Sequence, residues 1–220
     1  MTKLYFIRHG KTEWNLESRY QGMHGDSPLL PESYHEIKRL GKHLRTVSFT
    51  QMYASPIKRA RDTANYLRTQ LNQKLKLTLM SGLSEFDLGK MEGMAFQEVA
   101  QQFPTEFDAF RNHPDRYNAS NIAGESFDQV IRRFKQAVDE IVSNHPGDQN
   151  VIIVSHGAAM NAGINGLLGV SLDHLRDRGG LSNTSTTILE AQSPMDGYQL
   201  VQWNETDYLN RSENDPTDTI

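Results

Sequence analysis

The chain has 220 residues, a formal net charge of −4 and no cysteine. The absence of cysteine excludes a disulfide framework, a thiolate metal site and a cysteine nucleophile. The acidic balance argues against a nucleic-acid-binding surface of the usual basic kind. No stretch approaches the roughly 18 consecutive apolar residues that a membrane span needs. We therefore expect a cytoplasmic globular protein that binds neither nucleic acid nor membranes.

Strand-like and helix-like segments alternate along the chain. Short apolar runs predict six strands, at 3–7, 49–54, 76–80, 151–155, 185–191 and 198–203. Between them, apolar residues recur on one helix face over 37–47 and, most strongly, over 127–142. Ser55 and Pro56 are typical of an N-cap and a first helical residue, which predicts a helix over 56–71. This alternation predicts an α/β fold, a three-layer sandwich whose mostly parallel central sheet of about six strands has helices on both faces.

Residues 81–124 depart from this alternation. Glycines and prolines separate short apolar clusters there, which predicts a helical insertion folded over the functional site. Its large apolar side chains either select bulky ligands or form the insertion's own small core. They are Phe86, Met94, Phe96, Phe103, Phe107 and Tyr117. We expect a single domain over 1–203 that includes this insertion, followed over 204–220 by an acidic, mobile tail with too little apolar content to pack well.

Two predicted strands end in similar motifs. Arg8-His9-Gly10 follows the first strand, and Ser155-His156-Gly157 follows the fourth. Open α/β sheets build their sites at the carboxyl ends of their strands. An arginine beside a histidine is a poor structural pair, because like charges disfavour the protonated ring. With an anion between them the pair becomes useful, since the guanidinium holds a phosphoryl group while a neutral imidazole attacks phosphorus.

The second motif, at 155–157, has two compatible interpretations. Ser155 is typical of an N-cap for a helix that begins at Gly157, and a helix N-terminus is also an anion site. His156 and His9 could instead share a metal ion. However, no His-x-x-x-His or compact carboxylate–histidine spacing supports a metal site. We therefore expect His156 and Gly157 to contact the same anion as His9.

Further charged residues are candidates for the same chemistry. The basic run that contains Lys58, Arg59 and Arg61 is typical of a solvated helix face. Arg59 nevertheless lies one turn into a helix that starts at a strand's carboxyl end, so we assign it alone to the cleft. A departing alkoxide needs a proton, and a partly desolvated carboxyl group can supply it. The spacing alone does not choose among the three candidate acids, Glu85, Asp87 and Glu92.

These segments together resemble the histidine phosphatase superfamily, also called the phosphoglycerate mutase-like family. The resemblance covers residues 4 to about 191. Any one motif is moderately specific, and all of them in the family's order are very specific. They are Arg-His-Gly at 8–10 with Thr12, Trp14 and Asn15, Tyr-Gln-Gly at 20–22, Ala-Ser-Pro at 54–56 with Arg59, Leu83 and Glu85 with Gly89 and Glu92-Gly93, and Ser-His-Gly at 155–157.

The resemblance implies a role for each matching residue. His9 would be the nucleophile that forms a phosphohistidine, and Glu85 the proton donor. The phosphoryl oxygens would be bound, and their charge stabilised, by Arg8, Arg59 and His156. Asn15, Gln21 and Gly22 would line the pocket, together with Gly157 at the helix start. The resemblance implies no metal ion and no organic cofactor.

Within the family, the segment Leu88–Gly93 resembles the phosphatase branch. A mutase has to retain its phosphoryl group and would need a second anion clamp, for which 95–123 offers only Arg111 and Arg116. We therefore predict a hydrolase of small phosphorylated metabolites, with broad specificity as one option. The alternatives are a 2,3-bisphosphoglycerate-dependent phosphoglycerate mutase and an inactive phospho-ligand binding module. The sequence leaves the natural substrate and the oligomeric state open.

Overall fold

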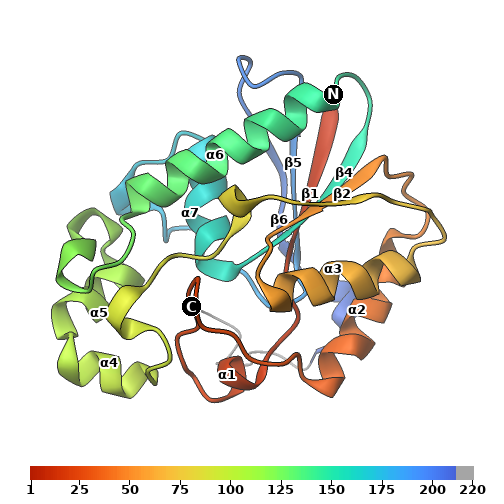
Figure 1. Cartoon of the computed structure of the whole chain (residues 1–220). Helices are drawn as coiled ribbons and strands as arrows, with labels where there is room; N and C mark the ends of the chain where they lie inside the picture. The colour runs from red at the N-terminus through yellow and green to blue at the C-terminus, as the bar shows by residue number, and fades with distance from the viewer. Residues whose placement is uncertain (212–220) are drawn as a thin grey trace.

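A mixed six-stranded sheet forms the centre of the protein (Figure 1). The computed structural model describes residues 1–211, so the predicted tail beyond Arg211 lies outside the described residues. The strands are β1 (Thr2–Arg8), β2 (Gln51–Ala54), β3 (Leu77–Leu79), β4 (Asn150–Ser155), β5 (Thr186–Ala191) and β6 (Gln199–Glu205), in the order β3-β2-β4-β1-β5-β6. β5 runs antiparallel to both of its neighbours, and the other pairs are parallel. The six predicted strands and the mostly parallel sheet are confirmed.

Helices cover both faces of this sheet (Figure 1). On one face α6 (Phe127–Asn144) and α7 (Gly157–Leu167) pack against side chains such as Leu4 and Phe6 of β1. On the other face α2 (Pro31–Leu44) and α3 (Lys58–Gln70) pack against Tyr5 and Ile7. Successive residues of β1 thus point to opposite faces, as the pleat requires, and both faces are buried. The predicted three-layer sandwich is confirmed.

The segment 81–124 is helical, as predicted, and packs with residues of α6 and α7 in one hydrophobic cluster. It contains α4 (Phe96–Gln102) and α5 (Pro104–Asn112), which lie to one side of the sheet (Figure 1). Phe86 and Phe110 are fully buried, and their rings meet edge to face with centroids 5.2 Å apart. All six large apolar side chains predicted for the insertion belong to this cluster. Phe96 also lines the pocket described below, and ligand selection by these side chains stays a prediction.

The C-terminal segment that the structure describes corrects the predicted start of the tail. β6 continues to Glu205, and Leu209 in the turn after it is fully buried. Arg211 forms an ion pair with Glu36 of α2 at 2.6 Å. The prediction of a poorly packed tail from Asn204 is therefore wrong for residues 204–211, because one buried leucine and one ion pair are enough to fix a short segment against α2. The single-domain boundary at 203 stays a prediction.

Both predicted serine N-caps are also wrong. α3 begins at Lys58 with Ile57 in the N-cap position, and α7 has His156 there. The Ser55 hydroxyl lies 2.7 Å from Nε2 of His156, and the Ser155 hydroxyl donates to the carbonyl of Leu83 at 2.7 Å. Each hydroxyl thus bonds to a residue far away in the sequence that the sheet brings next to it. A local capping pattern cannot reveal such a competitor.

Candidate active site

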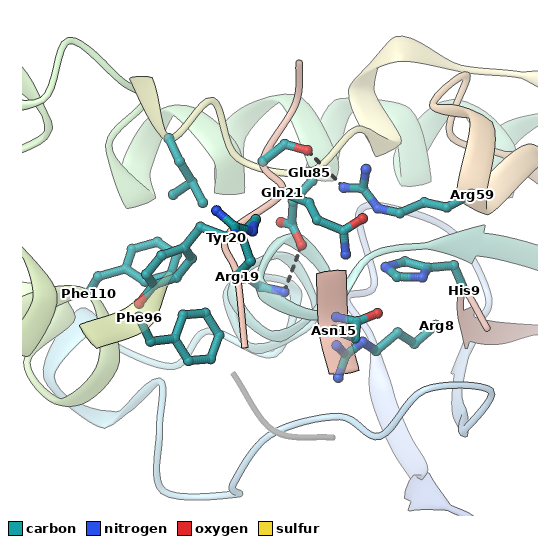
Figure 2. A pocket seen from close by; sticks show the side chains of 13 residues that line it. Arg8, His9, Asn15, Arg19, Tyr20, Gln21, Arg59, Glu85, Phe96 and Phe110 are labelled. Carbon is teal, nitrogen blue, oxygen red and sulfur yellow. Dashed lines mark hydrogen bonds between the residues drawn. The ribbon is translucent and has the colours of Figure 1, made fainter. Parts of the chain in front are cut away.

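The two strand-end histidines meet at the carboxyl ends of β1 and β4. These strands are parallel neighbours with Arg8 in register with Ser155, so His9 and His156 emerge side by side. Their ring centroids are 5.2 Å apart. His9 borders a pocket at this edge of the sheet (Figure 2). Six other predicted site residues line the same pocket: Arg8, Asn15, Gln21, Gly22, Arg59 and Glu85.

A backbone hydrogen bond sets the tautomer of His9. The Nδ1 atom lies 2.8 Å from the carbonyl oxygen of Gly10, and a carbonyl can only accept. Nδ1 therefore carries the proton, and Nε2 keeps a free lone pair. The main chain is held as well, since the N–H of Gly10 donates to the Thr63 hydroxyl at 3.0 Å and the Asn183 side chain donates to the carbonyl of His9 at 2.9 Å. His9 is thus oriented with one nucleophilic nitrogen.

Burial and neighbouring cations keep both histidines neutral. Burial lowers the pKa of His9 well below 6.5, and the positive charges of Arg59 and then Arg8 lower it further, against a smaller opposing effect of the Gly10 hydrogen bond. Burial also lowers the pKa of His156 well below 6.5, and Arg59 contributes next. Two uncharged imidazoles at neutral pH therefore stand beside two guanidinium groups.

His156 has one engaged nitrogen and one buried nitrogen without a partner. The Ser55 hydroxyl accepts the N–H of Ile57 at 3.2 Å and has its single proton left for Nε2 of His156. This assignment leaves the ring proton on Nδ1, which is buried and has no hydrogen-bond partner. An unpartnered buried donor is costly unless a ligand accepts its proton.

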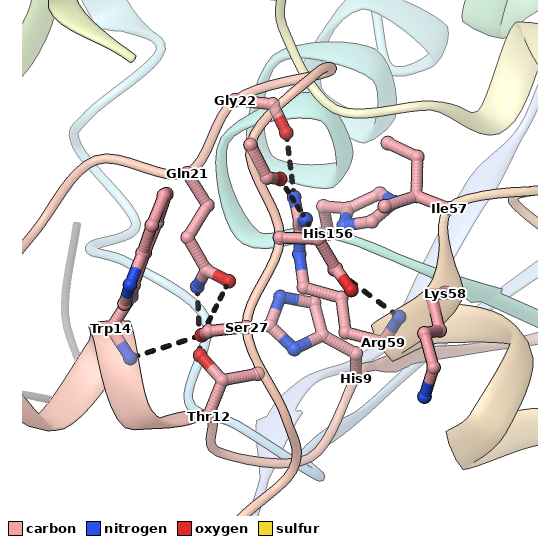
Figure 3. A network of polar contacts seen from close by, with 12 residues as sticks. His9, Thr12, Trp14, Gln21, Gly22, Ser27, Ile57, Lys58, Arg59 and His156 are labelled. Atoms are coloured by element: carbon pink, nitrogen blue, oxygen red, sulfur yellow. Dashed lines mark hydrogen bonds and ion pairs between the residues drawn. The ribbon is translucent and has the colours of Figure 1, made fainter. Parts of the chain in front are cut away.

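The two arginines are anchored by backbone carbonyls. The guanidinium of Arg59 donates to the carbonyls of Gly22 at 2.8 Å and Gly25 at 2.9 Å, and it pairs with Asp26 at 3.1 Å (Figure 3). Arg8 donates to the carbonyl of Leu181. Both side chains are about 2% exposed. These contacts fix the orientation of both guanidinium groups beside His9, whose pKa they lower.

The loop that orients Arg59 is itself held by Glu92. The Glu92 carboxylate accepts the backbone N–H groups of Met23, His24, Gly25 and Leu88, at 2.8 to 3.1 Å. Gly22 adopts a positive φ of 65°, and a Cβ there would lie 2.2 Å from Glu92 Oε1. These four bonds remove Glu92 from the candidate acids. Asp87 does not line the pocket, and one of its oxygens accepts the N–H of Gly89 at 2.9 Å.

Glu85 is the carboxyl group that the fold delivers to the pocket. Its Oε1 atom accepts the N–H groups of Phe86 at 2.9 Å and Ala159 at 2.8 Å, and Oε2 accepts that of Ala158 at 3.2 Å. Oε1 is thus saturated, while Oε2 keeps a lone pair. Glu85 also occupies the N-terminal turn of α7, the anion site that the sequence suggested for a phosphate. Of the first three residues of α7, only Gly157 remains for the predicted ligand contact.

Arg133 of α6 is a residue that the sequence gave no reason to select. Its guanidinium donates to the carbonyls of Gly82, Ser84 and Glu85 at 2.7 to 3.0 Å. The same group pairs with Glu125 at 2.8 Å. It therefore fixes the backbone that carries Glu85. Its position in a long amphipathic helix looks like that of any charged surface residue.

Asn15 and Gln21 reach the pocket through a shared polar network, of which Figure 3 shows Thr12, Gln21 and Ser27. Thr12 joins them, because its hydroxyl lies 3.0 Å from Oδ1 of Asn15 and accepts the side-chain N–H of Gln21 at 2.8 Å. Ser27 donates to the Gln21 side-chain oxygen at 3.2 Å. Lys58, which the prediction left outside, is exposed and pairs with Asp62. Among residues 1–211 no group of three or more His, Cys, Asp or Glu side chains is arranged to hold a metal ion.

The fold and the site together are those of a known enzyme class. The model of the histidine phosphatase superfamily (branch 1) matches residues 4–206, and the chain belongs to this family. It is 33% identical over 172 residues to phosphoserine phosphatase 1 of Hydrogenobacter thermophilus, covering 78% of this chain and 79% of that protein. It is 32% identical over 166 residues to a metal-independent phosphoserine phosphatase of Arabidopsis thaliana, covering 74% and 67%.

Solved structures agree with these sequence relatives. YhfR of Bacillus stearothermophilus superimposes with a TM-score of 0.87 at 33% identity, covering 96% of this chain and all of that one. A phosphoserine phosphatase of Entamoeba histolytica, solved with 3-phosphoglyceric acid, gives 0.81 at 26% identity, covering 95% and 100%. The predicted family, fold and enzyme class, a phosphatase, are confirmed, and the mutase is less favoured. Within the described part of the chain, no helix is long and apolar enough to cross a bilayer.

Proposed function

We propose that this site hydrolyses small phosphomonoesters through a covalent phosphohistidine on His9. The observation that carries the proposal is the orientation of the His9 ring. Its Nδ1 proton is committed to the Gly10 carbonyl at 2.8 Å, so the nitrogen left to react is Nε2. The anchored guanidinium groups of Arg8 and Arg59 stand beside it, where they favour a phosphoryl group and the neutral ring. Such preorganised charge is typically the largest contribution to catalysis.

In the first step the lone pair of Nε2 attacks phosphorus and forms the P–N bond. The P–O bond to the leaving group breaks, and the leaving oxygen takes a proton from Glu85. We assign this proton to Oε2 of Glu85. Oε1 already accepts two backbone N–H groups, whereas Oε2 accepts a single one at 3.2 Å. The leaving alcohol departs neutral, and Glu85 becomes a carboxylate.

In the second step water attacks phosphorus. The P–N bond breaks and its electron pair returns to Nε2, while Glu85 takes the proton of the water. Inorganic phosphate is released, and the acid is regenerated. Throughout, Arg8 and Arg59 bind the phosphoryl oxygens, and the buried Nδ1–H of His156 donates to one of them. Asn15, Gln21 and Gly22 of the pocket lining, with Gly157 at the start of α7, complete the set of binding residues.

The proposal includes the setting of the enzyme. The ligand is a small molecule, with neither nucleic acid nor a membrane as partner. Residues 1–203 act as one domain, and the protein works in the cytoplasm, as its cysteine-free composition predicts.

The test is phosphate release from p-nitrophenyl phosphate and from 3-phosphoglycerate with EDTA present, for wild type and His9→Ala. The proposal predicts release in wild type that His9→Ala abolishes. Release that survives in the variant, or that stops with EDTA, contradicts the mechanism. Isomerisation of 3-phosphoglycerate without phosphate release supports the mutase instead.

A further inference from the structure

The segment that follows β6 carries two polar side chains that α2 holds in place. Tyr208 lies in the turn after β6 and stacks its ring on that of His43 of α2, with ring centroids 4.6 Å apart. Arg211, three residues further along the chain, pairs with Glu36 of the same helix through both carboxylate oxygens, at 2.7 and 2.6 Å. The Tyr208 hydroxyl and the Arg211 guanidinium are therefore fixed near the start of β5. We call these two residues the C-terminal pair.

The C-terminal pair donates hydrogen bonds to the main chain just before β5. The Tyr208 hydroxyl donates to the carbonyl of Thr184 at 2.7 Å and lies 2.8 Å from the Thr186 hydroxyl. A phenol has one proton, so Thr186 is the donor in the second bond. The Arg211 guanidinium donates to the carbonyl of Asn183 at 2.9 Å. Two consecutive carbonyls are thus each held by a side chain of the C-terminal pair.

Asn183 and Thr184 in turn hold the backbone of the nucleophile. The Asn183 side chain donates to the carbonyl of His9 at 2.9 Å, and the N–H of Thr184 donates to the carbonyl of Arg8 at 3.0 Å. The Asn183 amide also donates to Oδ1 of Asn15, a residue of the pocket lining, at 3.4 Å. These contacts fix the backbone at the phosphate end of the pocket, the end that holds Arg8 and His9.

Thr184 adopts a backbone conformation that threonine rarely takes. Its φ is +61°, in the left-handed region, where a β-branched side chain is strained. Such strain persists only where the surroundings fix the residue, and Thr184 is fully buried. Without the bond from Tyr208 to its carbonyl, Thr184 can relax towards a negative φ. That change would turn its N–H away from the carbonyl of Arg8.

We propose that Tyr208 and Arg211 are positioning residues for the reaction at His9. This inference rests on the proposed function, because it assigns the C-terminal pair to the nucleophile of that mechanism. Neither residue lines the pocket, so each acts through Asn183 or Thr184 and not on the ligand. With these two residues held, Nε2 of His9 is aligned for attack on phosphorus. A misplacement of the order of 1 Å can lower the rate of such a step about 10²-fold.

The first test is Tyr208→Phe, which keeps the ring on His43 and removes the hydroxyl. We expect kcat to fall about 5- to 10-fold, the worth of one hydrogen bond. The loss should be equal for p-nitrophenyl phosphate and glycerol 3-phosphate, because the nucleophile and not the leaving group is affected. The inhibition constant of inorganic phosphate should stay within about threefold, because the carbonyls that anchor Arg59 do not contact the C-terminal pair. An inhibition constant that rises as much as kcat falls overturns the proposal.

Two comparisons separate positioning from a general loss of stability. Arg211→Gln removes the other half of the C-terminal pair and should also lower kcat, about 3- to 10-fold. Tyr198→Phe is the matched control, since its hydroxyl donates to Asp139 at the same distance, 2.7 Å, and Tyr198 packs against the α6 face of the sheet. This control should leave kcat unchanged. Equal losses of kcat in Tyr198→Phe and Tyr208→Phe overturn the proposal.

A double variant tests the part that strain plays. Glycine adopts a positive φ without strain, so the conformation of residue 184 depends less on Tyr208 once Thr184 is replaced by glycine. In the Thr184→Gly background, Tyr208→Phe should therefore lower kcat by no more than about twofold. The same 5- to 10-fold loss in both backgrounds contradicts the role assigned to Thr184.

Hydrogen exchange distinguishes failure of this inference from failure of the proposed function, because it needs no substrate. In Tyr208→Phe the amide of Thr184 should exchange about 5- to 10-fold faster than in wild type, whereas that of Ile152 in the central strand β4 should not change. If wild type hydrolyses no phosphomonoester, the proposed function fails, and exchange still decides whether Tyr208 fixes Thr184. Unchanged exchange at Thr184 overturns the inference.

Discussion

The phosphate end of the pocket and the insertion beside it hold their cations in different ways. At the phosphate end, Arg59 donates to the carbonyls of Gly22 and Gly25, and Arg8 donates to that of Leu181. In the insertion, Arg111 rests on aromatic rings, and its buried Nη1 has no acceptor. The first arrangement is complete before a ligand arrives, as transition-state stabilisation requires. The second leaves a buried donor without a partner, which costs stability in the folded protein.

Among variants at the phosphate end, we expect the largest loss of activity from Glu85→Gln. An alkoxide leaves poorly without a proton, so kcat/KM for glycerol 3-phosphate should fall by roughly 10²- to 10⁴-fold. The loss on p-nitrophenyl phosphate should stay within about tenfold, because its leaving group needs little protonation. kcat/KM reports steps up to leaving-group departure, so the later use of Glu85 as a base does not enter. Equal losses on both substrates would remove Glu85 from the acid role.

Arg133→Lys should also reduce kcat/KM more for an alkyl ester than for an aryl ester, but by a smaller factor than Glu85→Gln. Lysine keeps the charge but cannot hold the carbonyls of Gly82, Ser84 and Glu85 together, so Glu85 shifts. We expect kcat/KM for glycerol 3-phosphate to fall about 10- to 50-fold, with p-nitrophenyl phosphate within about threefold. The exposed neighbour Arg132 is the matched control, and Arg132→Lys should change neither substrate. A uniform loss on both substrates would mean that Arg133 supports only the fold.

Ser55→Ala should have a smaller and different effect. It removes the hydroxyl that donates to Nε2 of His156, so the ring proton is no longer held on Nδ1. One lost hydrogen bond predicts a fall in kcat/KM of about 5- to 15-fold, equal for alkyl and aryl esters, because the phosphoryl group and not the leaving group is affected. A loss confined to alkyl esters would contradict the role assigned to His156.

The smallest perturbation is a change of pH in the free enzyme. Burial, Arg59 and Arg8 lower the pKa of His9 below 6.5, so its ring should stay neutral as pH falls through 6.5. A hydrogen bond that the His174 ring donates to the Asp177 carboxylate raises the pKa of this exposed histidine, which should therefore take up its proton first. Ring NMR signals followed from pH 8 to 5 give both titrations.

The lowered pKa of His9 also predicts how the free energy of unfolding changes with pH and how an Arg59 variant titrates. The unfolded chain binds protons that buried His9 excludes, so the free energy of unfolding should fall as pH drops below 6.5. Arg59→Ala should raise the His9 pKa. Titration of His9 together with His174 would contradict the assigned electrostatics.

The strand-end motifs made the phosphate end predictable. His9 and His156 follow apolar runs, and parallel neighbouring strands bring such positions together whatever lies between them. Arg59 was predictable because its helix starts at the same edge of the sheet.

The remaining residues depend on contacts that spacing does not encode. Spacing could not select Glu85, since the choice depends on which carboxylate lines the pocket, and Glu92 instead accepts four backbone N–H groups of the neighbouring loops. Ser55 looked like a helix cap, and its actual partner His156 lies on another strand. Arg133 gave no local signal, because it acts on segments that the tertiary fold alone brings near.

The central claim is the covalent intermediate on His9, and rapid quenching tests it most directly. Wild type is mixed for milliseconds with a phosphomonoester labelled in its phosphoryl group, then stopped in alkaline denaturant, and the label on the protein is counted. We predict label that is stable to alkali, labile to acid, located on the peptide that contains His9 and absent from His9→Ala. Full turnover with no protein-bound label, or label on His156 instead, would contradict the account.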